Sequence, residues 1–127
     1  MEEIDSPSSY FLDSYALIEI VNENGNYKKF GETINFTGFM NLLEVHSAIT
    51  REFGAEKADS IIDKFKELSI DIEINDVKEA SKFKLKNAKK KFSYVDCISY
   101  AMAFNRKMKF VTGDREFEGV HSVEFVK

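Results

Sequence analysis

The chain has 127 residues, of which 43% are hydrophobic and 31% charged, and its formal net charge at pH 7 is −4. This length fits one domain spanning residues 1–127, and this composition excludes a disordered acidic protein or a fibrous repeat. The six glycines and single proline are too few for an all-β chain of many tight turns, so helices with few strands are expected.

The apolar segments are too short for a membrane protein. No apolar run exceeds five residues, far below the ~18 needed to span a bilayer. Residues 1–9 lack the pattern of a secretory signal and are expected to form a loose lead-in. The single cysteine, Cys97, cannot form an internal disulfide, which suits a reducing compartment. We therefore expect a cytoplasmic protein without membrane contact.

Positive charge is concentrated in one stretch of the sequence. Residues 78–109 contain ten Lys or Arg against Glu79 and Asp96, a balance of +8 that leaves −12 for the rest of the chain. Such a stretch can contact nucleic-acid phosphates, although a lysine run is more often the solvated face of a helix. Charge alone leaves both interpretations open.

The first half of the chain alternates apolar segments of two kinds. Residues 10–12 predict a strand, and the spacing in residues 16–21 predicts a helix that ends at the turn 24–26. Residues 33–37 alternate like a strand, and apolar residues from Phe39 onward recur at helical intervals until Gly54. Strand, helix, strand and helix are therefore expected.

The second half continues this pattern. Residues 58–68 predict a helix, and the strict alternation of residues 70–74 gives the clearest strand candidate. Asp76 is predicted to be the N-cap of a lysine-rich helix reaching about Asn87, and a further helix opens at residues 92–96. Short strands are predicted at 109–112 and 123–126, with a turn at Gly113 and Asp114 between them.

Strands that alternate with helices of this length predict βαβ units and right-handed crossovers. The predicted fold class is α/β, a three-layer α/β/α arrangement around a mainly parallel central sheet of four to five strands. Ligands of such sheets bind beyond the carboxyl ends of the strands, where strand order reverses. Acidic residues at that edge are therefore informative.

Four acids stand at or near this edge. Asp13 directly follows the first strand, Asp96 lies in the first turn of a helix, and Asp114 follows the strand 109–112. Glu44 lies in the helix from Phe39, at the flank of its apolar stripe. Each has a structural alternative: Asp13 as an N-cap, Asp96 in a capping box with Ser93, Asp114 as a turn residue and Glu44 as an exposed glutamate. The four together favour a site.

Four sequence blocks containing these acids occur in an order that resembles the PIN-domain ribonucleases, among them the small single-domain toxins of the VapC type. The blocks are FLDSYAL at 11–17, NLLEV at 41–45, FSYVDCISYA at 92–101 and FVTGDREF at 110–117, with the acids 31, 52 and 18 residues apart. The resemblance covers nearly the whole chain. In two departures, Ser14 stands where the family usually has Thr, and Cys97 where a small apolar residue is usual.

The resemblance implies a PIN-like fold and an acidic metal site formed by Asp13, Glu44, Asp96 and Asp114, which would be the catalytic residues. Carboxylates about 5 Å apart repel by roughly 3 kcal/mol per pair at an effective dielectric of 20, so a divalent cation, Mg²⁺ or Mn²⁺, is the expected cofactor. Asp13 and Asp96 are the expected main ligands, with Asp114 completing the site directly or through water. Glu44 would hold a second metal or position the attacking water, and Glu116 is a candidate fifth acid.

The activity implied by the resemblance is hydrolysis of RNA, leaving a 5′ phosphate and a 3′ hydroxyl. The implied partners are an RNA substrate and a small antitoxin protein that docks on the helices 39–53 and 58–68 and inserts an Arg among the acids. A homodimer is compatible with the sequence, which does not fix the oligomeric state.

The main alternative is a non-catalytic PIN-like RNA-binding module or a receiver-like signalling module. A receiver usually pairs two acids near the end of the first strand, whereas only Asp13 is present here. A phosphatase of the haloacid dehalogenase type needs Asp-x-Asp, but Tyr15 occupies the second position. Outside the acids, His46 is expected to be a hydrogen-bonded core residue, and Tyr94, Tyr100 and Phe104 to serve packing.

Overall fold

A parallel sheet forms the centre of the computed structural model, which describes residues 9–127, so that nearly all of the predicted lead-in lies outside the described residues. Its five strands are β1 (Tyr10–Leu12), β2 (Asn35–Gly38), β3 (Ser69–Ile70), β4 (Lys109–Thr112) and β5 (Val123–Phe125). They lie in the order β3-β2-β1-β4-β5, and every neighbouring pair is parallel. The strand order therefore reverses between β1 and β4, where a ligand site is expected.

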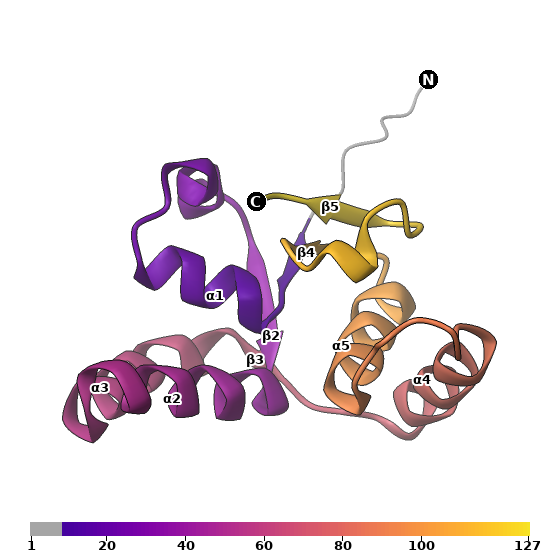
Figure 1. The fold of residues 1–127 in the computed structure, drawn as a ribbon, viewed down its shortest axis with the longest axis horizontal. Coiled ribbons are helices and arrows are strands. Elements are labelled where there is room, and N and C mark those ends of the chain that lie inside the picture. The colour runs from indigo at the N-terminus through magenta and orange to yellow at the C-terminus, as the bar shows by residue number, and fades with distance from the viewer. Residues whose placement is uncertain (1–8) are drawn as a thin grey trace.

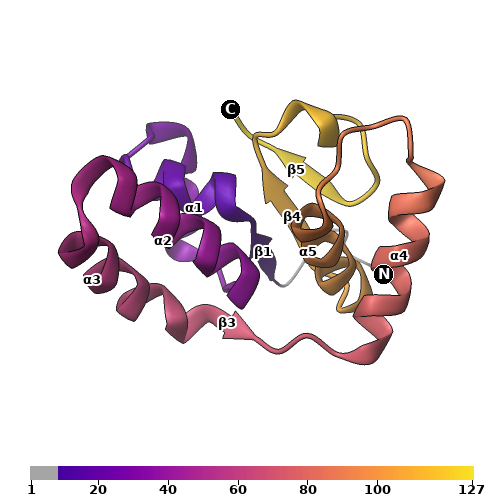
Figure 2. The ribbon, with the colours of Figure 1, turned by 60° about the horizontal axis from the view of Figure 1, so that its bottom comes forward.

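Helices cover both faces of this sheet. The helices α1 (Ser14–Val21), α2 (Phe39–Phe53) and α3 (Ala55–Phe65) lie on one side, and α4 (Ile74–Lys86) and α5 (Tyr94–Asn105) on the other, as Figures 1 and 2 show. Three 3₁₀ helices complete the described chain: η1 (Gly25–Glu32), η2 (Lys66–Leu68) and η3 (Arg115–Phe117). The predicted three-layer α/β/α class is confirmed.

Alternation along the central strands divides the core into two halves. Phe11 and Phe110 stack with ring centroids 5.9 Å apart and pack against α4 and α5, whereas Leu12 and Val111 pack against α1 to α3. Because successive residues of a strand point to opposite faces, each central strand contributes to both halves. This two-sided burial fixes β1 and β4 beside each other and places the residues that follow them at one edge.

A strand is present where residues 70–74 predict one, but the predicted extent is wrong. Only Ser69 and Ile70 pair with β2, and α4 already begins at Ile74. A capping box explains the early start, because the Glu73 N–H donates to Asp76 Oδ2 at 2.8 Å. Asp76 is thus the third helical residue. The N-cap is Glu73, and not Asp76 as the sequence predicts.

Three further predictions need correction. His46 is no core residue: its side chain is 36% exposed and its Nε2 lies 2.7 Å from Asp59 Oδ1, so it joins α2 to α3. Tyr94 and Phe104 are 78% and 47% exposed, and only Tyr100 is buried as expected of a packing residue. Cys97 is buried, in agreement with its predicted packing role. Among residues 9–127, none of the helices combines the length and the apolar character needed to cross a membrane.

Candidate active site

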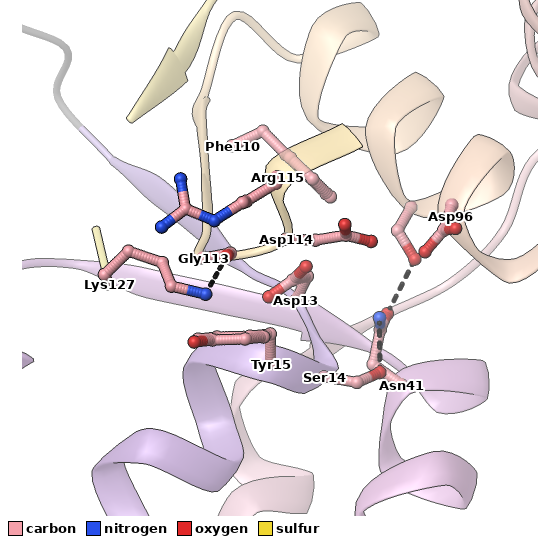
Figure 3. A pocket seen from close by; sticks show the side chains of 11 residues that line it. Asp13, Ser14, Tyr15, Asn41, Asp96, Phe110, Gly113, Asp114, Arg115 and Lys127 are labelled. Atoms are coloured by element: carbon pink, nitrogen blue, oxygen red, sulfur yellow. Dashed lines mark hydrogen bonds between the residues drawn. The ribbon is translucent and has the colours of Figure 1, made fainter. Parts of the chain in front are cut away.

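Three of the four predicted acids line one cavity at the edge where strand order reverses. Asp13 follows β1, Asp96 lies in the first turn of α5, and Asp114 follows β4. The cavity has a volume of about 530 Å³, and these side chains reach it from three different elements (Figure 3). Residues separated by up to 101 positions in the chain are therefore brought together by the parallel topology.

Each of the three acids also caps a helix. Asp13 Oδ1 accepts the Ala16 N–H at 2.9 Å, and Asp96 Oδ2 accepts the Ser93 N–H at 2.8 Å. Asp114 Oδ1 accepts the Glu116 N–H at 3.0 Å and begins η3. The capping roles expected from the sequence are therefore present, but each uses one carboxylate oxygen. A carboxylate has two oxygens with about four acceptor positions, so capping leaves capacity for a ligand.

Burial and mutual repulsion alter the acidity of these groups. Asp13 is 6% exposed, and its burial, together with the charges of Asp96 and Asp114, raises its pKa from 3.8 to about 7, although hydrogen bonds from Thr112 and Ala16 oppose the rise. Burial also raises the pKa of Asp96, with contributions from Asp114 and Glu44. Among residues 9–127, no Lys or Arg forms a salt bridge with the three acids. Their charge is thus left uncompensated by an ion pair from that part of the chain.

Glu44 lies beside the cavity and does not line it. Its side chain is exposed, and its Oε1 accepts a hydrogen bond from Ser14 Oγ at 2.5 Å. Ser14 does line the cavity and accepts in turn from Asn41 Nδ2 at 3.1 Å. Asn41 Oδ1 accepts from Ser99 Oγ at 3.1 Å, so a chain of polar contacts joins α5, α2 and α1 (Figure 3).

Asn41 and Ser99 are not among the residues that the sequence predicts for the site. Both are buried, at 2% and 1% exposure, and both line the cavity. A signal was present for Asn41, because it occupies a core position of α2 next to Leu42, where an apolar residue is expected. Ser99 follows Asp96 by one helical turn and so faces the same side of α5.

Two cationic side chains, Arg115 and Lys127, line the same cavity. Lys127 Nζ donates to the Gly113 carbonyl at 3.2 Å and lies 5.1 Å from the centroid of the Tyr15 ring. Gly113 is closely packed against Tyr15, since a Cβ on Gly113 would overlap the Tyr15 ring. Glu116, the candidate fifth acid, is not among the lining residues, and its Oε1 accepts the Lys91 N–H at 3.2 Å.

The donor set of the cavity fits a divalent cation that keeps part of its water shell. Within residues 9–127, no three His, Cys, Asp or Glu side chains are close enough to enclose a metal ion by themselves. Mg²⁺ usually retains several waters and uses one or two carboxylates together with substrate phosphates, so it needs no closed cage. Buried carboxylates, a serine hydroxyl and an amide oxygen supply the hard oxygen atoms that Mg²⁺ and Mn²⁺ prefer.

Comparisons with known proteins agree with this architecture. Three similar solved structures are VapC20 of Mycobacterium tuberculosis, described as a Sarcin-Ricin loop cleaving toxin, VapBC of Salmonella typhimurium bound to DNA, and VapBC2 of Rickettsia felis bound to a promoter fragment. Their TM-scores are 0.78, 0.74 and 0.73, and their sequence identities to this chain are 16%, 17% and 14%. The superpositions cover 93%, 92% and 94% of this chain and 99%, 96% and 99% of those chains, respectively.

Sequence comparison identifies the family directly. No curated protein matches the sequence significantly. The family model described as "PIN domain" matches residues 10–122, a range that includes all four predicted acids. The chain therefore belongs to the PIN domain family.

Proposed function

We propose that this protein is an endoribonuclease that hydrolyses RNA phosphodiester bonds with Mg²⁺ or Mn²⁺, and that it is the toxin of a toxin–antitoxin pair. One observation carries the enzymatic part of the proposal: Asp13, Asp96 and Asp114 of a PIN-domain chain line one cavity, and no Lys or Arg of residues 9–127 forms a salt bridge with them. Ionised carboxylates held together favour cation binding.

Carboxylates of the acidic cavity would hold the cation together with water molecules and the substrate phosphate, with Glu44 at the rim. A divalent cation there would supply charge neutralisation for the phosphate and activation of a water molecule. Asp13 would have to be ionised to act as a ligand, and because burial raises its pKa to about 7, a cation bound there would displace a proton near neutral pH. Ser14 orients the Glu44 carboxylate, which can accept a proton from, or position, the attacking water. Arg115 and Lys127 can offset the charge of the substrate phosphate.

Product analysis tests the reaction. Metal-stripped protein is incubated with a pool of structured and single-stranded RNAs, with and without Mg²⁺ or Mn²⁺. Cleavage is expected only with metal, and the new 5′ ends should accept labelled phosphate from polynucleotide kinase only after phosphatase treatment. RNA that is bound and stays intact in the presence of either metal would support the RNA-binding module and contradict the ribonuclease.

The toxin role draws support from the surface as well as from the fold. Exposed apolar side chains of α2, namely Phe39 at 63%, Leu43 at 60% and Phe53 at 47% exposure, give a protein partner a surface to cover. On α3, Ala58 is buried and Ile61, Ile62 and Phe65 pack against the core, so α2 presents most of the exposed apolar surface of the predicted docking helices. A small antitoxin is the proposed occupant, and the solved relatives include toxin–antitoxin complexes.

Expression in a heterologous host tests this role. The native chain should arrest growth, whereas Asp13→Asn, which keeps a capping oxygen for α1, should not. Co-expression of a small protein encoded beside the native gene should relieve the arrest. Equal growth of both strains at matched expression would contradict the toxin role while leaving ribonuclease activity to be judged by the purified protein.

A further inference from the structure

A second cavity, which we call the α4–α5 cavity, lies away from the acids. Its volume is about 450 Å³, and it is lined by side chains of α4 and α5 and by residues that precede β5. It shares no residue with the acidic cavity. A concave site of this size is large enough for a nucleotide-sized ligand.

One wall of the α4–α5 cavity is aromatic. Phe104 is 47% exposed, yet its ring has two aromatic neighbours: it stacks on Tyr100 with centroids 6.1 Å apart and meets His121 edge-on at 6.2 Å. Tyr100 in turn stacks on Phe83 at 4.6 Å and is buried. A fixed ring that remains half exposed provides a stacking surface, and such a surface accepts any nucleobase because every base has a π-face.

The rim of this cavity is basic. Lys82 and Lys86 both line it, and with Lys78 they recur every four residues, so they follow one face of α4 at about 6 Å per step. Glu79 is the acid that also lines it and lies 3.6 Å from Lys82, which leaves a positive balance at the rim. Lysines that recur along one face of a helix can contact the phosphates of a flexible strand.

The connection from α4 to α5 joins the basic rim to the neighbourhood of the acidic cavity. Beyond α4, Lys90 Nζ donates to the Glu116 carbonyl at 2.9 Å, and Lys91 N–H donates to Glu116 Oε1. The Glu116 N–H donates to Asp114 Oδ1, so the connection from α4 to α5 is fastened beside one of the three acids. Figure 2 shows this connection running from the end of α4 past the C-terminal part of the chain to the start of α5.

We propose that the α4–α5 cavity binds one nucleotide of the single-stranded RNA that flanks the scissile bond. Its base stacks on Phe104, its phosphate lies at Lys82 and Lys86, and the strand follows the α4–α5 connection to Asp114. This inference rests on the proposed ribonuclease function and names the side of the protein over which the substrate runs. The lysines of α4 would then contribute favourably to the free energy of RNA binding by a protein whose net charge is negative.

Fluorescence anisotropy with a labelled single-stranded RNA tests the inference. The probe is mixed with chelated Asp96→Asn protein, so that binding is measured without cleavage. Lys82→Gln combined with Lys86→Gln should weaken binding about tenfold and lower the salt slope by roughly 1.4 units of log K per log salt, or 0.7 per lost contact. Phe104→Leu, which removes the aromatic ring and keeps an apolar side chain, should weaken binding about tenfold.

Lys57→Gln combined with Lys64→Gln on α3 is the matched control, because it changes the net charge equally on exposed lysines of another helix. It should weaken binding less than twofold. Equal effects of the two double variants, with melting temperatures unchanged, would overturn the inference, as would binding of an acidic peptide in place of RNA. Cleavage by the native chain is measured separately. If the native chain cleaves RNA and the Lys82→Gln, Lys86→Gln variant still binds RNA with native affinity, this inference alone is contradicted. If the native chain does not cleave RNA, the proposed function is contradicted.

Discussion

Ser14 on α1 donates a 2.5 Å hydrogen bond to Glu44 on α2, so the fourth predicted acid is tied to the wall of the acidic cavity. Glu44 would otherwise be an exposed side chain with many rotamers. The same hydroxyl accepts from the buried Asn41 amide, which fixes its direction. The hydroxyl of Ser14 is therefore expected to matter for positioning of Glu44 more than for stability.

Ser14→Ala should lower kcat about tenfold with a smaller effect on KM, because it releases Glu44 and leaves Asn41 without its acceptor. The free energy of unfolding should fall by only about 1 kcal/mol. Ser14→Thr is the control, since it keeps the hydroxyl and should keep most of the activity. Steady-state kinetics and urea denaturation separate the two effects, and loss of activity in Ser14→Thr with native stability would contradict the positioning role.

Asp13→Asn should stabilise the metal-free protein above neutral pH. The folded-state pKa of Asp13 is raised to about 7, so between pH 4 and pH 7 the folded protein holds a proton that the unfolded chain has lost. The native protein therefore loses stability as pH rises through this window, by a few kcal/mol in total, whereas Asn does not titrate. Denaturation in chelator at pH 5 and pH 8 checks this. A difference between variant and native protein that is the same at both values would contradict it.

The buried pair between Asp76 and Arg106 should govern stability without affecting chemistry. Two hydrogen bonds of 2.9 Å join the guanidinium to the carboxylate, which is 1% exposed. Asp76→Ala should cost about 3 kcal/mol, because it removes both of these hydrogen bonds and leaves the partly buried guanidinium with the longer, 3.6 Å ion pair to the exposed Glu73. Asp63→Ala, which removes an exposed partner of Lys66, should cost at most about 0.5 kcal/mol. Similar losses in the two variants would contradict this ranking.

The same pair predicts a dependence on pH. Burial alone would raise the pKa of Asp76, but hydrogen bonds from Arg106, the Glu73 N–H and Asn105 lower it below the ordinary 3.8. The ionised carboxylate therefore stabilises the fold fully above about pH 4, and this stabilisation is lost as pH falls through the lower folded-state pKa. The stability gap between the native protein and Asp76→Asn should be constant from pH 7 to pH 5 and should narrow below pH 4.

Gly113→Ala should disturb the acidic cavity through packing. A Cβ at this position would overlap the Tyr15 ring and lie 2.5 Å from the Val126 carbonyl oxygen, so the turn that carries Asp114 must shift. A stability loss of about 1–3 kcal/mol is expected, together with weaker Mg²⁺ binding. Gly25→Ala is the control, because no atom lies within 4 Å of its added Cβ. Unchanged melting temperature in Gly113→Ala would contradict the close packing.

Most of the fold could be predicted from local patterns. The short apolar strands β1 and β4 are followed by Asp13 and by Gly113 with Asp114, and Gly54 ends α2 as the spacing predicts. The strand at residues 70–74 is predicted too long, because alternation within five residues is also compatible with a loop that leads into a helix. The capping box between Glu73 and Asp76 instead starts α4 at Ile74. The helix η1 went unpredicted, although Tyr27 and Phe30 are buried at the three-residue spacing of a 3₁₀ turn.

The candidate site also contains residues that could be predicted from the sequence and contacts that could not. Asp13 and Asp114 could be placed because they follow adjacent parallel strands, whose carboxyl ends share one edge. The contact between Asn41 and Ser99 could not, since it joins residues 58 positions apart and no local pattern encodes their pairing. The bond from Ser14 to Glu44 likewise depends on how α1 packs on α2.

Metal-dependent cleavage by the Asp96→Asn variant tests the central claim most directly. Asn keeps an oxygen for the Ser93 N–H and so keeps the cap of α5, but it removes one negative charge from the acidic cavity. In pre-chelated buffer titrated with Mg²⁺, the native protein and the exposed-site control Asp63→Asn should cleave RNA equally. Asp96→Asn should be slower by roughly a hundredfold or more, with a melting temperature equal to or above that of the native protein. Undiminished cleavage by Asp96→Asn, or native cleavage that persists without any divalent metal, would contradict the account.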